Sequence, residues 1–125
     1  MLNAGITALL QLLAGTASPN QYSNANAKIG VGDDGTTPEN PVQTGLQAIT
    51  NKTYAGMIVS YPTVVDQTVT FKASFGTGDA NHGWKEFVVT NNASVGTIAL
   101  NRKVEDEGVK ISGQVWEITL AITLA

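Results

Sequence analysis

The C-terminal segment 114–124 alternates large apolar side chains with small or polar ones over its whole length. A period of two places successive side chains on opposite faces of an extended chain, so the pattern predicts a long β-strand with one apolar face. Each large side chain on that face contributes about 1.5–3 kcal/mol if it becomes fully buried. We therefore expect a β-rich core that contains the side chains of this face: Trp116, Ile118, Leu120, Ile122 and Leu124.

Five further segments have the composition or alternation of strands: 28–32, 53–61, 68–75, 84–90 and 98–104. Segment 53–61 is apolar on both faces, which predicts a central strand that ends at Tyr61-Pro62. Because no helices separate the strands, we expect an antiparallel β-sandwich or barrel of about six to eight strands. No repeat or linker divides the chain, so residues 1–125 are expected to form one domain. The other predicted core residues are Phe71, Phe75 and Trp84.

Residues 3–14 are rich in Ala and Leu, which favours a single N-terminal helix. Asn3 is the expected N-cap, and Gly15 is the expected C-terminal stop. The large aliphatic side chains follow helical spacing and form one apolar stripe. We expect this stripe to contact either the sheet or a partner chain, and its candidate contact residues are Ile6, Leu9, Leu10 and Leu13.

The surface is expected to be polar but weakly charged. Only 14% of the 125 residues are charged, against about 25% in typical soluble domains. Thr, Asn, Ser and Gly replace them, and such groups cost less to desolvate than Lys or Glu, which is compatible with large subunit contacts. A general preference of β-proteins for Thr is the alternative explanation.

Several partner classes find no support in the sequence. The net charge is −3 without a basic stripe, which argues against nucleic acid as a partner. The apolar run 6–14 is far shorter than the roughly 20 residues of a membrane span, so no membrane partner is expected. The chain has no Cys, which excludes disulfides and thiolate chemistry.

Side chains that could support catalysis are few and scattered. His82 is the one histidine, and it lies in the Gly-rich segment 76–83, where we expect an exposed or locally hydrogen-bonded residue. The acids at 33–34 and 105–107 are neighbours in sequence and point apart, so they form no facing acid/base pair. We therefore predict no catalytic residues and no cofactor.

Two loop patterns leave alternatives open. Asp33, Asp34, Glu39 and Asn40 could offer oxygen ligands to calcium, although their spacing differs from an EF-hand, and an ordinary solvated loop is the alternative. The pairs Gly30/Gly32 and Gly76/Gly78 have the spacing of phosphate-binding loops. Neither pair leads into a helix, so turn glycines are expected at these positions.

Several short motifs together cover nearly the whole chain: LNAG…LL, NANAKIGVGDDGTT, Q-T-x-L-Q at 43–47, TFKASFG at 70–76, D-A-N-x-x-W-x-E at 79–86, LNRKVE at 100–105 and the closing W-x-I-T-L-A-I-T-L. The order of these motifs resembles a family of small virion structural proteins of tailed bacteriophages. It is also similar to the N-terminal attachment domain of some phage tail-fibre proteins. In this family Gly32-Asp33 and Trp84-x-Glu86 look structural, as a tight turn and as a core indole beside a hydrogen-bonded carboxylate.

The resemblance implies a non-enzymatic virion component, assembled in the bacterial host cytoplasm, that binds other virion proteins and forms a homo-oligomer. Because the chain stops at Ala125 without a receptor-binding region, we expect a capsid decoration protein. A tail, neck or tail-fibre attachment component is the alternative. An alternative of another class is a carbohydrate-binding β-sandwich for a host glycan, with Trp84 and the 32–40 and 76–84 loops as its site.

Overall fold

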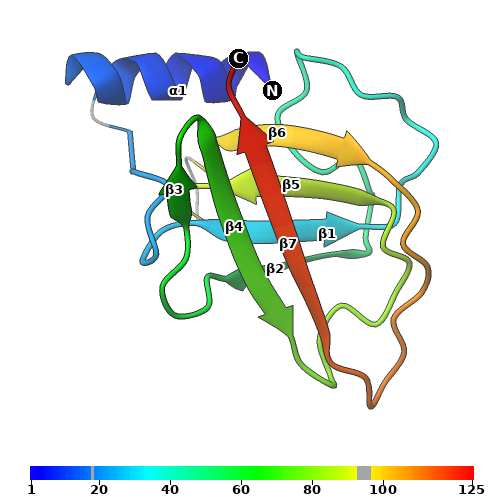
Figure 1. The fold of residues 1–125 in the computed structure, drawn as a ribbon. Coiled ribbons are helices and arrows are strands. Elements are labelled where there is room, and N and C mark those ends of the chain that lie inside the picture. The colour runs from blue at the N-terminus through cyan, green and yellow to red at the C-terminus, as the bar shows by residue number, and fades with distance from the viewer. Residues whose placement is uncertain (18, 93–96) are drawn as a thin grey trace.

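The protein is described by a computed structural model that covers residues 1–17, 19–92 and 97–125 (Figure 1). Within these residues the chain forms one helix and seven strands. In chain order they are α1 (Asn3–Ala14), β1 (Lys28–Gly32), β2 (Lys52–Gly56), β3 (Thr63–Val65), β4 (Thr68–Phe75), β5 (Glu86–Thr90), β6 (Ala99–Val104) and β7 (Trp116–Thr123).

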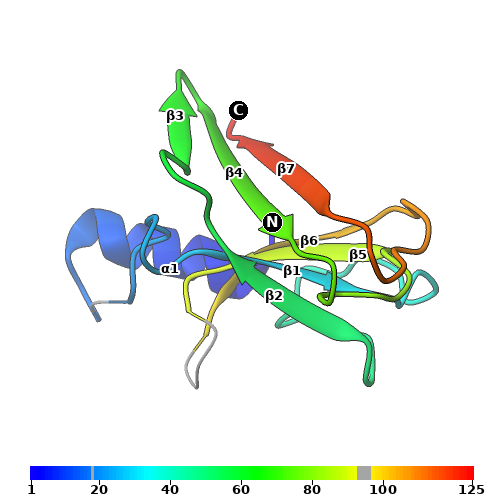
Figure 2. The same cartoon turned by 90° about the horizontal axis from the view of Figure 1, so that it is seen from below.

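The strands form two antiparallel sheets, which confirms the predicted sandwich; the sheets do not close into a barrel. The four-stranded sheet has the order β2-β1-β5-β6, and the three-stranded sheet has the order β3-β4-β7. Figure 2 shows β4 and β7 crossing over one face of the four-stranded sheet at a steep angle. The long strands β4 and β7 pair over eight residues without a bulge, from Thr68↔Thr123 to Phe75↔Trp116.

The core lies between the two sheets and is centred on Trp84, which is 2% exposed. Its ring meets Phe75, Trp116 and Phe87 edge to face, with centroids 4.9, 5.1 and 6.3 Å away. Its indole N–H donates to the Ala80 carbonyl at 3.0 Å, so the one polar atom of this side chain is satisfied. The predicted core positions Phe71, Phe75 and Trp84 are all buried.

The predicted core residues of β7 pack against this core but keep part of their surface exposed. The alternation is as expected: even-numbered side chains face the core and odd-numbered ones face solvent. Their burial is partial because β7 is an edge strand with no neighbour beyond it. The residues concerned are Trp116, Ile118, Leu120 and Ile122; Leu124, beyond the strand, is 53% exposed.

Three local predictions were wrong. The strand in 53–61 is short, spans Lys52–Gly56 and forms an edge of its sheet, and its apolar residues beyond Gly56 leave the ladder. The N-cap is Leu2 rather than Asn3, and no side chain caps this end of the helix. Gly32 is a strand glycine: a side chain there would collide with the Glu86 carboxylate.

The helix α1 is attached to β6 through backbone contacts. The N–H of Leu2 donates to the Leu100 carbonyl at 3.0 Å, and the N–H of Asn3 donates to the Pro41 carbonyl at 2.8 Å. Gly5 faces the same strand so closely that a Cβ there would lie 2.5 Å from the Leu100 oxygen. The helix ends as predicted at Gly15, whose φ is +69°. The glycine at position 5 therefore sets how closely the helix approaches the sheet.

Replacing Gly5 with Ala should destabilise the protein, even though Ala favours helices, because backbone atoms of β6 would have to move. We expect the free energy of unfolding to fall by about 1–3 kcal/mol, as for other overpacked sites. Urea denaturation followed by Trp fluorescence measures it. Gly45→Ala is the matched control, since a Cβ there meets open space. Equal stability of the two variants would contradict this account of the helix–sheet contact.

Candidate protein-binding surfaces

The structure does not bring the polar side chains considered for catalysis together. The Nδ1 of His82 lies 2.8 Å from the Gly83 carbonyl oxygen, and its Nε2 lies 3.2 Å from the Thr53 hydroxyl. His82 is thus the locally hydrogen-bonded loop residue that was expected. Within the described residues, no three His, Cys, Asp or Glu side chains gather in a group that could hold a metal ion.

The carboxylates of the candidate calcium loop are directed to separate partners. Asp33 accepts a hydrogen bond from the Asn51 amide at 2.7 Å. Asp34 accepts bonds from the hydroxyl and backbone N–H groups of Thr36 and Thr37, which hold the pKa of Asp34 well below its usual range. Glu39 accepts the backbone N–H of Val104 at 2.9 Å. The loop is therefore built by protein contacts instead of converging on an ion.

The carbohydrate-binding alternative depended on Trp84 as an aromatic platform. Its side chain is 2% exposed and surrounded by other rings, so no sugar can stack on it. The indole instead fills the core, as the resemblance implied. The structure thus removes the aromatic residue on which that alternative relied.

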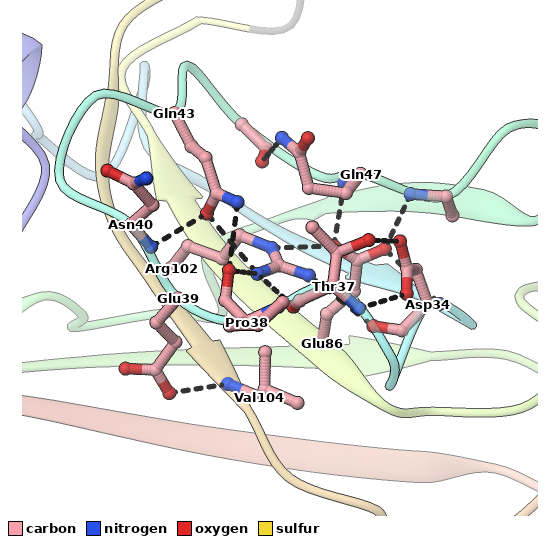
Figure 3. Close-up of polar contacts among 12 residues, drawn as sticks. Asp34, Thr37, Pro38, Glu39, Asn40, Gln43, Gln47, Glu86, Arg102 and Val104 are labelled. Carbon is pink, nitrogen blue, oxygen red and sulfur yellow. Dashed lines mark hydrogen bonds and ion pairs between the residues drawn. The ribbon is translucent and has the colours of Figure 1, made fainter.

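A buried ion pair occupies the outer face of the four-stranded sheet (Figure 3). Glu86 on β5 accepts the Nε–H of Arg102 on β6 at 2.9 Å, and both side chains are 0% exposed. The carboxylate also accepts the backbone N–H groups of Gln47 at 2.7 Å and Ala48 at 2.8 Å. A longer contact of 3.4 Å comes from the N–H of Asp34. Apart from Arg102, the hydrogen-bond donors to the Glu86 carboxylate thus come from an irregular segment of the chain.

The guanidinium of Arg102 holds the other end of the same segment. Its Nη1 donates to the carbonyl of Thr37 at 3.0 Å, and to Pro38 and the Gln43 side chain at 3.4 and 3.3 Å. Its Nη2 donates to the Asp34 carbonyl at 3.4 Å. Residues 34–48 are therefore fixed against the sheet by two buried charges, although they contain no helix or strand.

The sequence pattern missed this pair, although two signals pointed to it. Arg102 occupies a position in an alternating strand where its neighbours Leu100 and Val104 are apolar, which indicates a buried charge. The resemblance marked Glu86 as a carboxylate bonded to nearby backbone, and this is what the structure has. The partner is an Arg sixteen positions away, which no local spacing could reveal.

A second buried cation, Lys110, binds two loop residues. Its ammonium group donates to the Gly76 carbonyl and to the Asn81 side chain, both at 2.7 Å, and the residue is 0% exposed. It joins the segment before β7 to the loop after β4. Sequence reasoning did not single out Lys110, because it lies in a polar segment without periodicity.

Replacing Glu86 with Ala should lower the free energy of unfolding by about 3–5 kcal/mol, because a buried Arg102 charge would lose its counter-ion. Urea denaturation measures the change. The control is Glu105→Ala, which removes an exposed partner 3.5 Å from Lys103 and should change stability by no more than about 1 kcal/mol. Similar losses in both variants would show that the buried pair has no special role.

The first candidate contact surface is the outward face of α1. Leu9 packs against the core, whereas Ile6, Leu10 and Leu13 are 43%, 59% and 85% exposed. Their spacing of i, i+4 and i+7 places them on one side of the helix. The predicted stripe is therefore divided: one member contacts the protein itself, and three face solvent. We call Ile6, Leu10 and Leu13 the helix stripe.

The second candidate surface is a groove of about 660 Å³ between the edge strands β6 and β7. Trp116, Ile118 and Leu120 line one side of it, and Phe87 and Lys103 lie on the other. It exists because β7 crosses over the four-stranded sheet without another strand beyond it (Figure 2). The apolar face of β7 thus remains reachable from outside, and sequence alternation alone could not reveal this opening.

Comparisons with known proteins return no match: no family model, no curated protein and no solved structure matches the chain. The one helix among the described residues has twelve residues, and none there has the length and hydropathy to cross a membrane.

Proposed function

We propose that this chain is a non-enzymatic structural protein of a tailed-bacteriophage particle that binds other virion proteins. Within that class we favour a capsid decoration protein on the head surface. A tail, neck or tail-fibre attachment component is the alternative, and it would use the same kind of contact. The motifs quoted above support the virion assignment, and the helix stripe supports the mode of action.

The observation that carries the proposal is the exposure of the helix stripe. Three large aliphatic side chains on one face of a short helix are costly to leave in water, since each contributes about 1.5–3 kcal/mol when buried. The helix contacts β6 at Leu2 and Gly5. Ile6, Leu10 and Leu13 keep 43%, 59% and 85% of their surface exposed. Exposed apolar patches of this kind mark protein contact sites.

The weak charge of the surface supports the same function. Only 14% of the residues are charged, so a contact with a capsid or tail subunit would desolvate mainly Thr, Asn and Ser. These groups cost less to bury than ions. A protein that binds an extended particle surface through many such groups needs no reactive centre.

The double substitution Leu10→Asp and Leu13→Asp should abolish incorporation of the protein into particles, because two charges would enter an apolar contact. Both side chains are exposed, so the fold should remain intact, and circular dichroism checks it. Thr7→Asp is the matched control, because it adds a charge to an exposed helix position outside the stripe. Incorporation is measured by the amount of tagged protein that co-purifies with intact particles.

The location of the protein on the particle is tested with a gold-labelled antibody that binds the tag on intact particles. Label over the faces of the head supports decoration, and label at the neck or tail supports the alternative. Particles without label, or normal incorporation of the Leu10/Leu13 variant, would overturn the proposed contact.

A further inference from the structure

The free edge of β7 is unusual among the sheet edges of this protein. It is eight residues long and has neither proline, nor a positively charged side chain, nor a bulge. Such edges readily pair with another strand unless they are covered. The opposite edge of the same sheet, β3, has only three residues.

The neighbouring edge, β6, is covered by the protein itself. The Leu100 carbonyl accepts the N–H of Leu2, and the N–H of Val104 is bound by Glu39. The start of the helix and the 34–48 segment therefore each bind an outward-directed backbone group of β6. The edge of β6 is thus hydrogen-bonded to other segments of the protein, whereas the edge of β7, on the other side of the groove, remains open.

The pattern of hydrogen bonds identifies which backbone groups of β7 are free to pair. The N–H of Leu124 donates to the Gln67 carbonyl at 3.0 Å, which continues the β4–β7 ladder by one step. Bonded and non-bonded pairs alternate in an antiparallel ladder. Even-numbered residues of β7 therefore bond to β4, and the backbone N–H and C=O groups directed to the free edge belong to Glu117, Thr119, Ala121 and Thr123.

We propose that β7 pairs antiparallel with β7 of a second copy of this chain, about a two-fold axis that passes beside Leu120. The two three-stranded sheets then form one six-stranded sheet. Antiparallel pairing places directly opposed residues on the same face. In this register the odd-numbered residues bond to each other, as their free backbone groups require.

The side chains of β7 are complementary to themselves in this register. On the inner face, Leu120 lies opposite its own copy, Ile118 lies opposite Ile122, and Trp116 lies opposite Leu124. Leu124 is 53% exposed in the single chain and gains an aromatic neighbour. These inner side chains of the second copy cover the mouth of the 660 Å³ groove, and the same contact is made twice by symmetry.

Charge also favours a second copy on this edge. Glu117 is the one ionisable side chain of β7, and it lies opposite Thr123 of the other copy, so like charges do not meet. Its carboxylate is already held by Lys72 of β4 at 3.1 Å, a contact that raises the pKa of Lys72. At the centre of the outer face, Thr119 of each copy therefore lies opposite Ala121 of the other. No charged group has to be desolvated there.

Sedimentation velocity and light scattering over a range of concentrations test the association. We expect reversible formation of a species of twice 13.1 kDa. A mass of one chain at every concentration up to the solubility limit would overturn the proposal, and so would a stable trimer.

A single introduced cysteine tests the register, since the chain has none of its own. Opposed residues of a non-bonded pair have Cα atoms about 4.5 Å apart, within the range of a disulfide. Leu120→Cys should therefore form a disulfide-linked dimer under mild oxidation. Val64→Cys, at the opposite edge of the same sheet and 72% exposed, is the control and should stay largely monomeric on a denaturing gel. Equal cross-linking of both variants would contradict β7 pairing.

A pair of charge variants tests the same register without touching the core. Thr119 and Ala121 are exposed, and in the proposed pair each lies opposite the other residue of the second copy. Thr119→Glu with Ala121→Glu places like charges opposite each other, whereas Thr119→Glu with Ala121→Lys places opposite charges there. We expect the Kd values of the two dimers to differ by about tenfold or more.

Both variants share the Glu at position 119, which faces Lys72 of β4, so their folded chains differ only at position 121. Equal Kd values for the two would overturn the register. Loss of the dimer in the Leu10/Leu13 variant would instead assign self-association to the helix stripe and contradict this proposal. The pairing of β7 and the binding of virion proteins by α1 can thus fail separately.

Discussion

The ion pair between Glu86 and Arg102 dictates how one whole face of this protein is covered. Removing two charges from water costs several kcal/mol for each ion unless hydrogen bonds replace the lost solvent. Here the replacement comes from backbone groups of residues 34–48, which donate to the carboxylate and accept from the guanidinium. A segment without helix or strand is thereby held in one conformation, because its departure would break the hydrogen bonds that it makes to both charged groups.

The same pair constrains its surroundings. Gly32 on β1 has no side chain, and the Glu86 carboxylate occupies the space where one would lie. The ordered segment then supplies Glu39 to β6 and the Pro41 carbonyl to the N–H of Asn3. The position of α1 therefore depends on a segment whose own order depends on the two charges. This chain of contacts links a buried electrostatic interaction to the exposure of the helix stripe.

The sequence predicted the periodic parts of the fold well and the non-local parts poorly. Segments 28–32 and 68–75 and the helix 3–14 have the predicted bounds, because alternation and helical spacing are local properties. The prediction of a central strand over 53–61 was wrong, because an apolar composition does not distinguish a central strand from an edge strand followed by a loop. The pairing order of strands decides that, and it is set by contacts distant in sequence.

The candidate surfaces show the same division. The apolar stripe of the helix could be predicted, but its division between Leu9 and the three exposed residues depends on where Gly5 meets β6. The groove beside β7 could not be predicted, because alternation is identical in a covered and an uncovered strand. Only the sheet order, with β7 last in its sheet and β6 capped by other segments, identifies the open edge.

The two proposed contacts differ in symmetry, and this difference has a structural consequence. A two-fold pairing of β7 uses the same patch on both copies, so it closes on itself and cannot build an extended array alone. Its axis is perpendicular to the six-stranded sheet, so both four-stranded sheets, and the helices packed on their β6 strands, lie on the same side of the pair. The pair carries two helix stripes, so a particle surface with two neighbouring sites at the matching distance can bind both. Once the first stripe is bound, the second binds at a high effective concentration, so two individually weak apolar contacts can hold a small protein firmly on a large assembly.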